Sequence, residues 1–197
     1  YPIPLAIEFL FYLCSCRKYK IMAKELKVNS ERRWLAAYTR MHHEKKVRDR
    51  LTEMGITTFL PVQTVVRQWS DRKKKMERVL IPMMIFVHVD RAEQLEVLQL
   101  PAVIRYVVLR GEHTPTAIPD AQMEAFRFMV DFSESPVNFD ECNLQPGEKV
   151  RVVRGPLKGL TGELVTVGGK SSIVIRIELL GCAAVEMNAS MVERIGE

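Results

Sequence analysis

PGEKVRVVRGPLKGLTG, residues 146–162, is the stretch of this sequence that says most about the fold. It opens on a Pro-Gly turn and continues into an alternating segment, with Val150 and Val152 on one face and basic residues on the other. This pattern predicts a β-strand that is buried on one side. A Gly-Pro pair then predicts a turn, and Gly159 and Gly162 would allow a tight bend with positive φ before the next strand.

The rest of the C-terminal region repeats this pattern of strands and turns. Residues 145–197 are rich in Val, Ile and Gly, and further turns are expected at 168–169 and near 181. Four or five short strands joined in this way predict a small closed β-barrel. The β-branched run at 173–175 favours a stable barrel, because β-branched residues are poor helix formers.

The region before the barrel alternates strands and helices. Strands are expected over 34–39, 85–89 and 103–109, and a hairpin is expected from strands over 59–67 and 77–80 that face each other across a charged tip. Helices are expected over 41–54, over 92–100 and from Pro119 onward, the last burying a face made by Met123, Phe126, Met129 and Val130. This order predicts the α+β class, with an α/β sandwich followed by a small barrel.

Composition suggests where the domains begin and end. Residues 133–144 are acidic, contain a proline and lack periodicity, so they are expected to be a linker between domains at 31–132 and 145–197. Residues 1–30 are expected to lie outside the fold, as a disordered or non-native extension. Their apolar run, 3–13, is too short to span a bilayer.

Charge is unevenly distributed along the chain. The net charge is +5, but residues 31–90 carry 13 Lys and Arg against 7 Asp and Glu, whereas residues 91–197 carry 11 against 15. A basic half joined to an acidic half is compatible with contact to a polyanion and equally with a solubilising surface. The sequence contains no nucleophile, nucleotide-binding or paired-carboxylate motif, which argues against an enzyme.

The four cysteines show no metal-binding spacing, and only four histidines accompany them. We therefore expect no zinc site, no other metal and no cofactor. Scattered cysteines in a chain of this length also predict no disulfide framework, as in a reducing cytoplasm.

The stretch at 146–162 resembles the KOW motif of the NusG family of transcription elongation factors. The preceding region is also similar to that family: a Trp-containing strand over 34–38, a basic helix after it, a hairpin, and a proline followed by an apolar strand over 82–87. Leu60-Pro61 resembles the RfaH-like specialised paralogs. The runs YTR at 38–40 and HEKKV at 43–47 resemble the antiterminators of capsular polysaccharide operons in Bacteroides-type bacteria.

The resemblance implies an N-terminal NusG-type domain and an SH3-like barrel. It also implies that an apolar concavity of the first domain binds the clamp helices of RNA polymerase and suppresses pausing or termination, for specific polysaccharide operons. The corresponding polymerase-binding residues are Tyr38, Ile81, Met84 and Phe86. Family members often have Gly or Asn, then an aromatic residue, where this chain has Met83 and Met84. For Phe86, ordinary sheet core is an equally good interpretation.

The same resemblance implies contact with non-template or upstream DNA. The residues concerned are Arg40, His42, His43, Lys46 and Arg50 around the first helix, and Arg72, Lys73, Lys74 and Lys75 at the hairpin tip. A solvated helix face and a charged flexible loop are the alternatives.

The barrel of the family binds the Rho terminator or a ribosomal protein through a loop that corresponds here to Leu179, Leu180 and Gly181. The expected protein is thus a cytoplasmic monomer that does not contact membranes. A ribosomal or RNA-binding KOW protein that does not act on polymerase is the alternative function.

Overall fold

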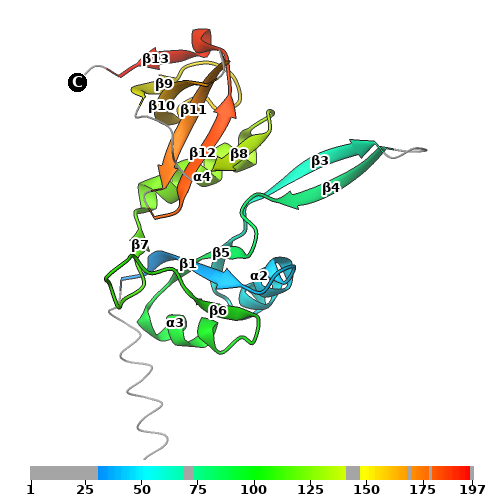
Figure 1. Ribbon diagram of the computed structural model, residues 1–197, viewed down its shortest axis with the longest axis vertical. Coiled ribbons are helices and arrows are strands. Elements are labelled where there is room, and N and C mark those ends of the chain that lie inside the picture. The colour runs from blue at the N-terminus through cyan, green and yellow to red at the C-terminus, as the bar shows by residue number, and fades with distance from the viewer. Residues whose placement is uncertain (1–30, 69–72, 141–146, 168–169, 178, 196–197) are drawn as a thin grey trace, which may run out of the picture.

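The structure is a computed structural model that describes residues 31–68, 73–140, 147–167, 170–177 and 179–195. Its first sheet is antiparallel, with the strand order β2-β5-β1-β6, and β7 also pairs with β1 (Figure 1). The bounds of these strands are β1 Arg33–Thr39, β2 Thr57–Phe59, β5 Met84–Val89, β6 Val103–Tyr106 and β7 Ala117–Ile118. β1 and β5 are central strands that are buried along almost their whole length. They therefore form the base on which the helices pack.

Three helices lie within the described residues, and they cover both faces of this sheet. α2 (Glu44–Glu53) and α3 (Arg91–Leu98) share a core with Leu35, Ile85 and Val87. α4 (Asp120–Phe132) lies on the opposite face, where Phe126 packs in one cluster with Ala36 and Phe86. All four residues expected on the buried face of α4 are buried. This layer of sheet between helices confirms the predicted α/β sandwich.

The predicted hairpin is present, but its first strand is shorter than expected. β3 (Val62–Gln68) and β4 (Lys73–Val79) pair only with each other and project away from the rest of the molecule (Figure 1). The sequence alternates without interruption from Phe59, which predicts one strand. In the structure Pro61 separates β2 from β3, because proline has no N–H to donate to a ladder.

The second sheet is antiparallel, with the strand order β13-β9-β10-β11-β12-β8. Its strands are β8 Val137–Asp140, β9 Glu148–Val152, β10 Thr161–Val167, β11 Lys170–Ile177, β12 Gly181–Glu186 and β13 Val192–Arg194. A short 3-10 helix, η2 (Ala189–Met191), precedes β13. The alternation predicted for β9 is correct, since Val150 and Val152 are buried and Arg151 is exposed. A β-rich unit therefore follows the sandwich, as the α+β class predicts.

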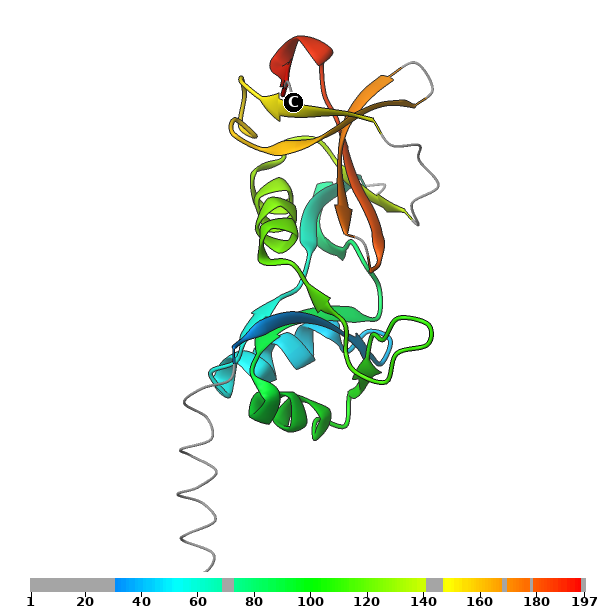
Figure 2. The ribbon, with the colours of Figure 1, turned by 90° about the vertical axis from the view of Figure 1, so that its left-hand side faces the viewer.

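The segment expected to be a linker contains a strand. β8 lies within 133–144 and pairs with β12, placing Phe139 opposite Ala183. Phe139 also lies 6.0 Å from the ring of Phe126 in α4, measured between centroids. The two sheets are therefore joined through α4, since Phe126 also contacts Phe86 of the first sheet, and Figure 2 shows α4 lying between them.

Two glycines of the sequence motif serve different purposes. Gly159 adopts φ +95°, as the predicted bend requires. Gly162 does not adopt positive φ; it lies in β10, where an added Cβ would stand 2.8 Å from the carbonyl oxygen of Val174. The expected bend at Gly162 is therefore wrong, and its glycine is explained by close packing between β10 and β11.

Cys182 of β12 is buried and disulfide-bonded. The scattered spacing of the cysteines predicts no disulfide framework. Spacing along the chain does not show which cysteines lie close together in the fold, so it could not reveal this bond. Among the described residues, no helix is long and apolar enough to cross a membrane.

Candidate macromolecular interface

Phe86 is the most deeply buried of the four residues expected to bind polymerase. Its side chain is 0% exposed in β5. Its ring meets Phe126 of α4 edge to face at a centroid distance of 5.9 Å, and Phe59 lies at 6.1 Å. The ring is thus part of the core beneath α4, and it cannot touch a partner while α4 packs as it does.

The other three expected residues are not equally accessible. Ile81 and Met84 are buried in the same cluster as Phe86. Tyr38 is half-buried at the end of β1, where it is the register partner of both Met84 and Arg105. The guanidinium of Arg105 lies 5.2 Å from the centroid of the Tyr38 ring, within the range of a cation–π contact. Tyr38 is therefore the accessible member of a set whose other members form core.

Two cations and two imidazole side chains gather at the start of α2. Arg40, His42, His43 and Lys46 are all exposed and come from the turn after β1 and the first turn of the helix. One ring nitrogen of His43 lies 2.9 Å from the carbonyl oxygen of Met41. A concentration of cations on one turn produces a local positive potential suited to phosphate.

Arg50 lies one helical turn beyond Lys46, but its charge is partly balanced. Its Nη1 donates to Glu53 at 2.8 Å on the same helix. Lys45, in the first turn of α2, donates to Glu77 of β4 at 2.7 Å. This hydrogen bond, and the charge of Lys45, hold the pKa of the Glu77 carboxyl below its usual value. The basic helix is thus tied to the projecting hairpin.

The hairpin cations are described only in part. Lys73, Lys74 and Lys75 belong to β4, opposite Gln68, Arg67 and Val66 of β3. Their side chains, and the whole of Arg72, lie outside the described residues. The backbone alone therefore places this charge on the distal part of the hairpin, away from both sheets (Figure 1).

The loop expected to contact a partner of the barrel is not free. Leu179 and Leu180 are half-buried and pack against the cluster that contains Phe86, Phe126 and Ile177. The N–H of Leu180 donates to the carbonyl of Ile177 at 2.8 Å, which closes the turn before Gly181 and β12. In this arrangement the side chains of both leucines pack against the core of this chain and are not displayed to a partner.

Sequence patterns did not reveal Glu44 as important. Its side chain is only 6% exposed, and its Oε1 accepts a hydrogen bond from the backbone N–H of Met83 at 2.8 Å. A glutamate in the first turn of an amphipathic helix is normally a solvated residue, so only the three-dimensional contact identifies it. Over the described ranges, no three His, Cys, Asp or Glu side chains are grouped to hold a metal ion.

Comparisons with known proteins agree on one family. Residues 32–127 match the family model NusG, described as transcription termination factor nusG. The chain is 27% identical over 167 residues to the transcription termination/antitermination protein NusG of Pasteurella multocida (strain Pm70), covering 81% of this chain and 85% of the relative. It is 26% identical over 178 residues to the NusG protein of Pseudomonas aeruginosa PAO1, covering 83% and 99% respectively.

Among solved structures, the chain is similar to one titled "Domain interaction in Thermotoga maritima NusG". The identity is 19% and the TM-score 0.47, over 84% of this chain and 98% of that one.

Proposed function

We propose that this chain is a member of the NusG family of transcription termination and antitermination factors, and that it binds RNA polymerase and suppresses pausing or termination. The match of residues 32–127 to the family model and the similarity to two NusG proteins support this proposal. The observation that carries the proposal is the half-exposed ring of Tyr38, displayed at the end of β1 next to Arg105. An aromatic ring that is apolar at its face and accessible at one side is a common anchor of protein interfaces. A ribosomal or RNA-binding role away from polymerase is not favoured by the family match.

The polymerase contact that we propose is centred on the accessible side chain of Tyr38. It differs in this respect from the open apolar concavity that the sequence led us to expect. Tyr38 packs against the core cluster that contains Ile81, Met84 and Phe86. These three residues would affect polymerase binding indirectly, by holding Tyr38 in place. The surface of the polymerase that we expect to be bound is the clamp helices. This assignment rests on the proposed family membership, and the partial exposure of Tyr38 is the feature of this chain that supports it.

The nucleic-acid contact that we propose lies beside this surface. The exposed side chains of Arg40, His42, His43 and Lys46 would face non-template DNA. The hairpin would extend toward upstream DNA, since it projects from the body and its distal part carries three consecutive lysines. Cations neutralise phosphate, and the planar guanidinium group of arginine and the imidazole ring of histidine can stack on unpaired bases.

The second sheet would bind Rho or a ribosomal protein through Leu179, Leu180 and Gly181. Because both leucines pack against the common core, this contact requires the loop to leave its present position. We further propose that the protein serves specific polysaccharide operons, on the basis of residues 38–40 and 43–47, which lie at the β1–α2 turn.

The experiment that tests this function is binding to purified bacterial core RNA polymerase, followed by transcription through a pause site. Tyr38→Asp should weaken binding about tenfold, since a carboxylate would be desolvated at the contact. Leu109→Asp is the matched control, because Leu109 is an exposed apolar residue outside this surface. The wild-type chain should shorten the pause and Tyr38→Asp should not. Equal binding of all three proteins would refute the proposed contact.

A further inference from the structure

Met83 adopts a backbone conformation that its side chain does not favour. Its φ is +61°, in the left-handed region. The Cβ of an L-residue crowds the backbone there, so glycine and asparagine are the usual occupants and a bulky side chain raises the energy. Within the described residues, His42 is the other non-glycine residue with positive φ, and it lies in the neighbouring turn. Two such residues at one corner are an unusual concentration of backbone strain.

Two hydrogen bonds maintain the conformation of Met83. Its N–H donates to the carboxylate of Glu44 at 2.8 Å, and its carbonyl oxygen accepts from the N–H of Thr39, also at 2.8 Å. A hydrogen bond to a carboxylate is stronger than one between neutral groups. Glu44 is nearly buried, so its carboxylate is withdrawn from water and directed at this one backbone group. The α2 helix thus holds the turn that precedes β5.

The same corner contains a second feature that lowers the stability of the fold. The hydroxyl of Thr39 is buried, and within the described part of the chain its oxygen is the one buried side-chain atom that lacks a hydrogen-bond partner. An unsatisfied buried hydroxyl lowers stability. Strain and unsatisfied polar groups that occur together typically mark sites that are shaped for function.

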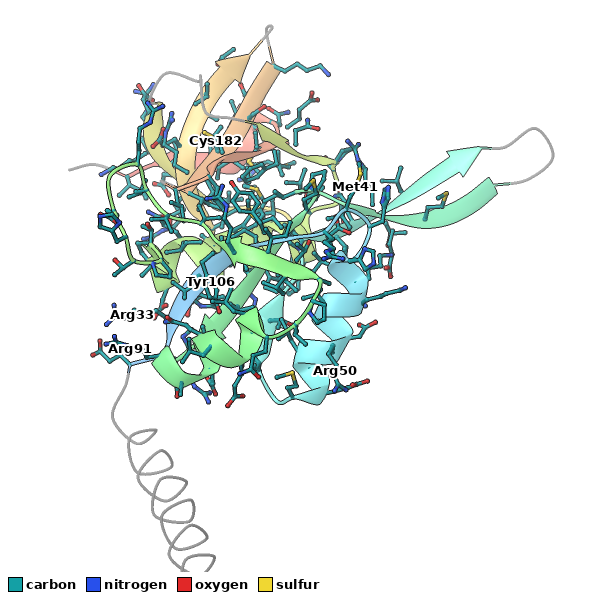
Figure 3. The ribbon with its side chains drawn as sticks, turned by 60° about the horizontal axis from the view of Figure 1, so that its bottom comes forward. Arg33, Met41, Arg50, Arg91, Tyr106 and Cys182 are labelled. Carbon is teal, nitrogen blue, oxygen red and sulfur yellow. The ribbon has the colours of Figure 1, made fainter. Side chains whose placement is uncertain are left out.

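The strained turn displays an apolar side chain at the surface. Met83 is 37% exposed and Met41 is 61% exposed. Met41 precedes His42, whose turn is joined to Met83 through Thr39 and Glu44. Figure 3 shows Met41 beside the base of the β3–β4 hairpin, on the opposite side of the domain from Arg33 and Arg91. Methionine side chains are flexible and polarizable, and they adapt well to a partner surface.

Two exposed arginines come from segments next to this turn. Arg40 is exposed and its N–H donates to the carbonyl of Ala102, which brings it close to the start of β6. Arg105 of β6 is exposed and lies over Tyr38. We call Tyr38, Arg40, Met41, Met83 and Arg105 the Met83 corner. An apolar centre with a cationic rim is complementary to an apolar protein surface flanked by Asp and Glu.

We propose that the Met83 corner is the specificity-determining part of the polymerase contact, that Met83 inserts between apolar side chains of an acidic-flanked polymerase surface, and that Glu44 is its positioning residue. The inference rests on the proposed function. Glycine would form the same turn without strain, so the methionine is explained by what its side chain contacts. A role in binding also accounts for a carboxylate on the buried, otherwise apolar face of α2, which Glu44 shares with Val47 and Leu51.

The decisive variant is Met83→Gly in the full chain, measured for thermal unfolding and for affinity to purified bacterial core RNA polymerase. Glycine relieves the strain and removes the contact, so the unfolding temperature should rise while the affinity falls about tenfold. If Met83 had a purely structural role, Met83→Gly would shift the unfolding temperature and the polymerase affinity in the same direction. Unchanged affinity, or a lower unfolding temperature, would overturn the proposal.

Glu44 is tested by a pair of variants. Glu44→Ala removes the acceptor and should lower both stability and affinity. Glu44→Gln keeps a side-chain oxygen in place to accept from Met83 N–H and should restore affinity to within about twofold of the wild type. If Glu44→Gln bound as weakly as Glu44→Ala while remaining folded, the charge and not the position of Met83 would be responsible, and the positioning role would be wrong.

A nucleic-acid role for the corner is separated by a third measurement. Arg105→Glu, at a residue outside the proposed DNA contact, should weaken polymerase binding and leave affinity for a single-stranded DNA of about 30 nucleotides within about twofold. Loss of DNA affinity with polymerase binding intact would assign the corner to DNA and overturn the proposal. If Tyr38→Asp loses its affinity for polymerase and Met83→Gly does not, the proposed function stands and only this inference fails. If the wild-type chain does not bind polymerase, the proposed function fails and this inference with it.

Discussion

The rings of Phe86 and Phe126 meet edge to face with centroids 5.9 Å apart, and this contact fixes α4 on the first sheet. Both side chains are fully buried. Phe126 also contacts Phe59, at 5.6 Å, and Phe139 of the second sheet, at 6.0 Å. The contact explains why a residue expected to bind a partner is instead part of the core.

Phe126→Ala should lower the free energy of unfolding by about 3–5 kcal/mol, because it leaves a cavity among three aromatic rings. Chemical denaturation measures this change. Phe132→Ala, on the same helix but exposed, should change it by less than about 0.5 kcal/mol. Similar effects of the two substitutions would contradict the packing described for α4.

Gln63 should prove essential for anchoring β8. Its amide nitrogen donates to the carbonyl of Ser135 at 3.1 Å, and its amide oxygen accepts from the N–H of Val137, also at 3.1 Å. Gln63→Ala leaves both backbone groups without these partners, at a cost of about 1–3 kcal/mol. Hydrogen exchange should become faster at Val137. The neighbouring exposed Thr64→Ala serves as the control, and unchanged exchange at Val137 in Gln63→Ala would be inconsistent with the bridge.

Glu77 should titrate below its ordinary pKa of 4.5, because Lys45 donates a hydrogen bond to the carboxylate and lies close to it. Since the pKa is lowered in the folded state, the interaction is present above the unfolded value and is lost as pH falls through the folded one. NMR titration of the Glu77 carboxyl should show the pKa returning toward 4.5 in Lys45→Ala. High salt should have the same effect on this exposed pair. Lys46→Ala, one residue away, should leave the Glu77 titration unchanged.

Gly162→Ala should destabilise the second sheet by about 1–3 kcal/mol, since the new Cβ would approach the carbonyl of Val174 and the side chain of Ile173 within 3 Å. Gly55→Ala provides the comparison, because no atom lies within 4 Å of the position that its new methyl group would occupy and only its positive φ is unfavourable. Its cost should be roughly 1 kcal/mol. Thermal unfolding distinguishes the two substitutions, and a Gly162→Ala protein as stable as the wild type would show that β10 and β11 are less closely packed.

Lys46→Ala should weaken binding to single-stranded DNA and lower the slope of log affinity against log salt by about 1, as expected for the loss of one phosphate contact. Arg91→Ala is the control, since Arg91 is exposed but lies on the opposite side of the domain from the start of α2 (Figure 3). Equal salt slopes in all three proteins would argue that Lys46 is an ordinary solvated lysine.

Local pattern was sufficient where an element has one buried face. Met123, Phe126, Met129 and Val130 repeat at helical spacing, and all four are buried in α4. The alternation of β9 was equally informative. In these elements most of the solvent-facing residues are polar, so the period of the apolar residues is visible in the sequence.

Pattern was insufficient where a strand is buried on both faces. Five of the six residues of β5 are buried, so the apolar run gives no indication of which face Phe86 occupies. The strand β8 was missed for the opposite reason. Its four residues, VNFD, lie in an acidic segment after a proline, and only pairing with β12 makes them a strand. The left-handed conformation of Met83 is also invisible in sequence, since it depends on a carboxylate 39 positions away.

A helix that supplies apolar side chains to two sheets has a consequence for how the molecule loses its structure. The ring of Phe126 touches the first sheet and β8 at once, so neither sheet can melt without exposing surface that the other one covers. Scanning calorimetry would then record a single endotherm. A fragment that ends after α4 would expose the apolar surface that β8 normally covers, and it would tend to self-associate.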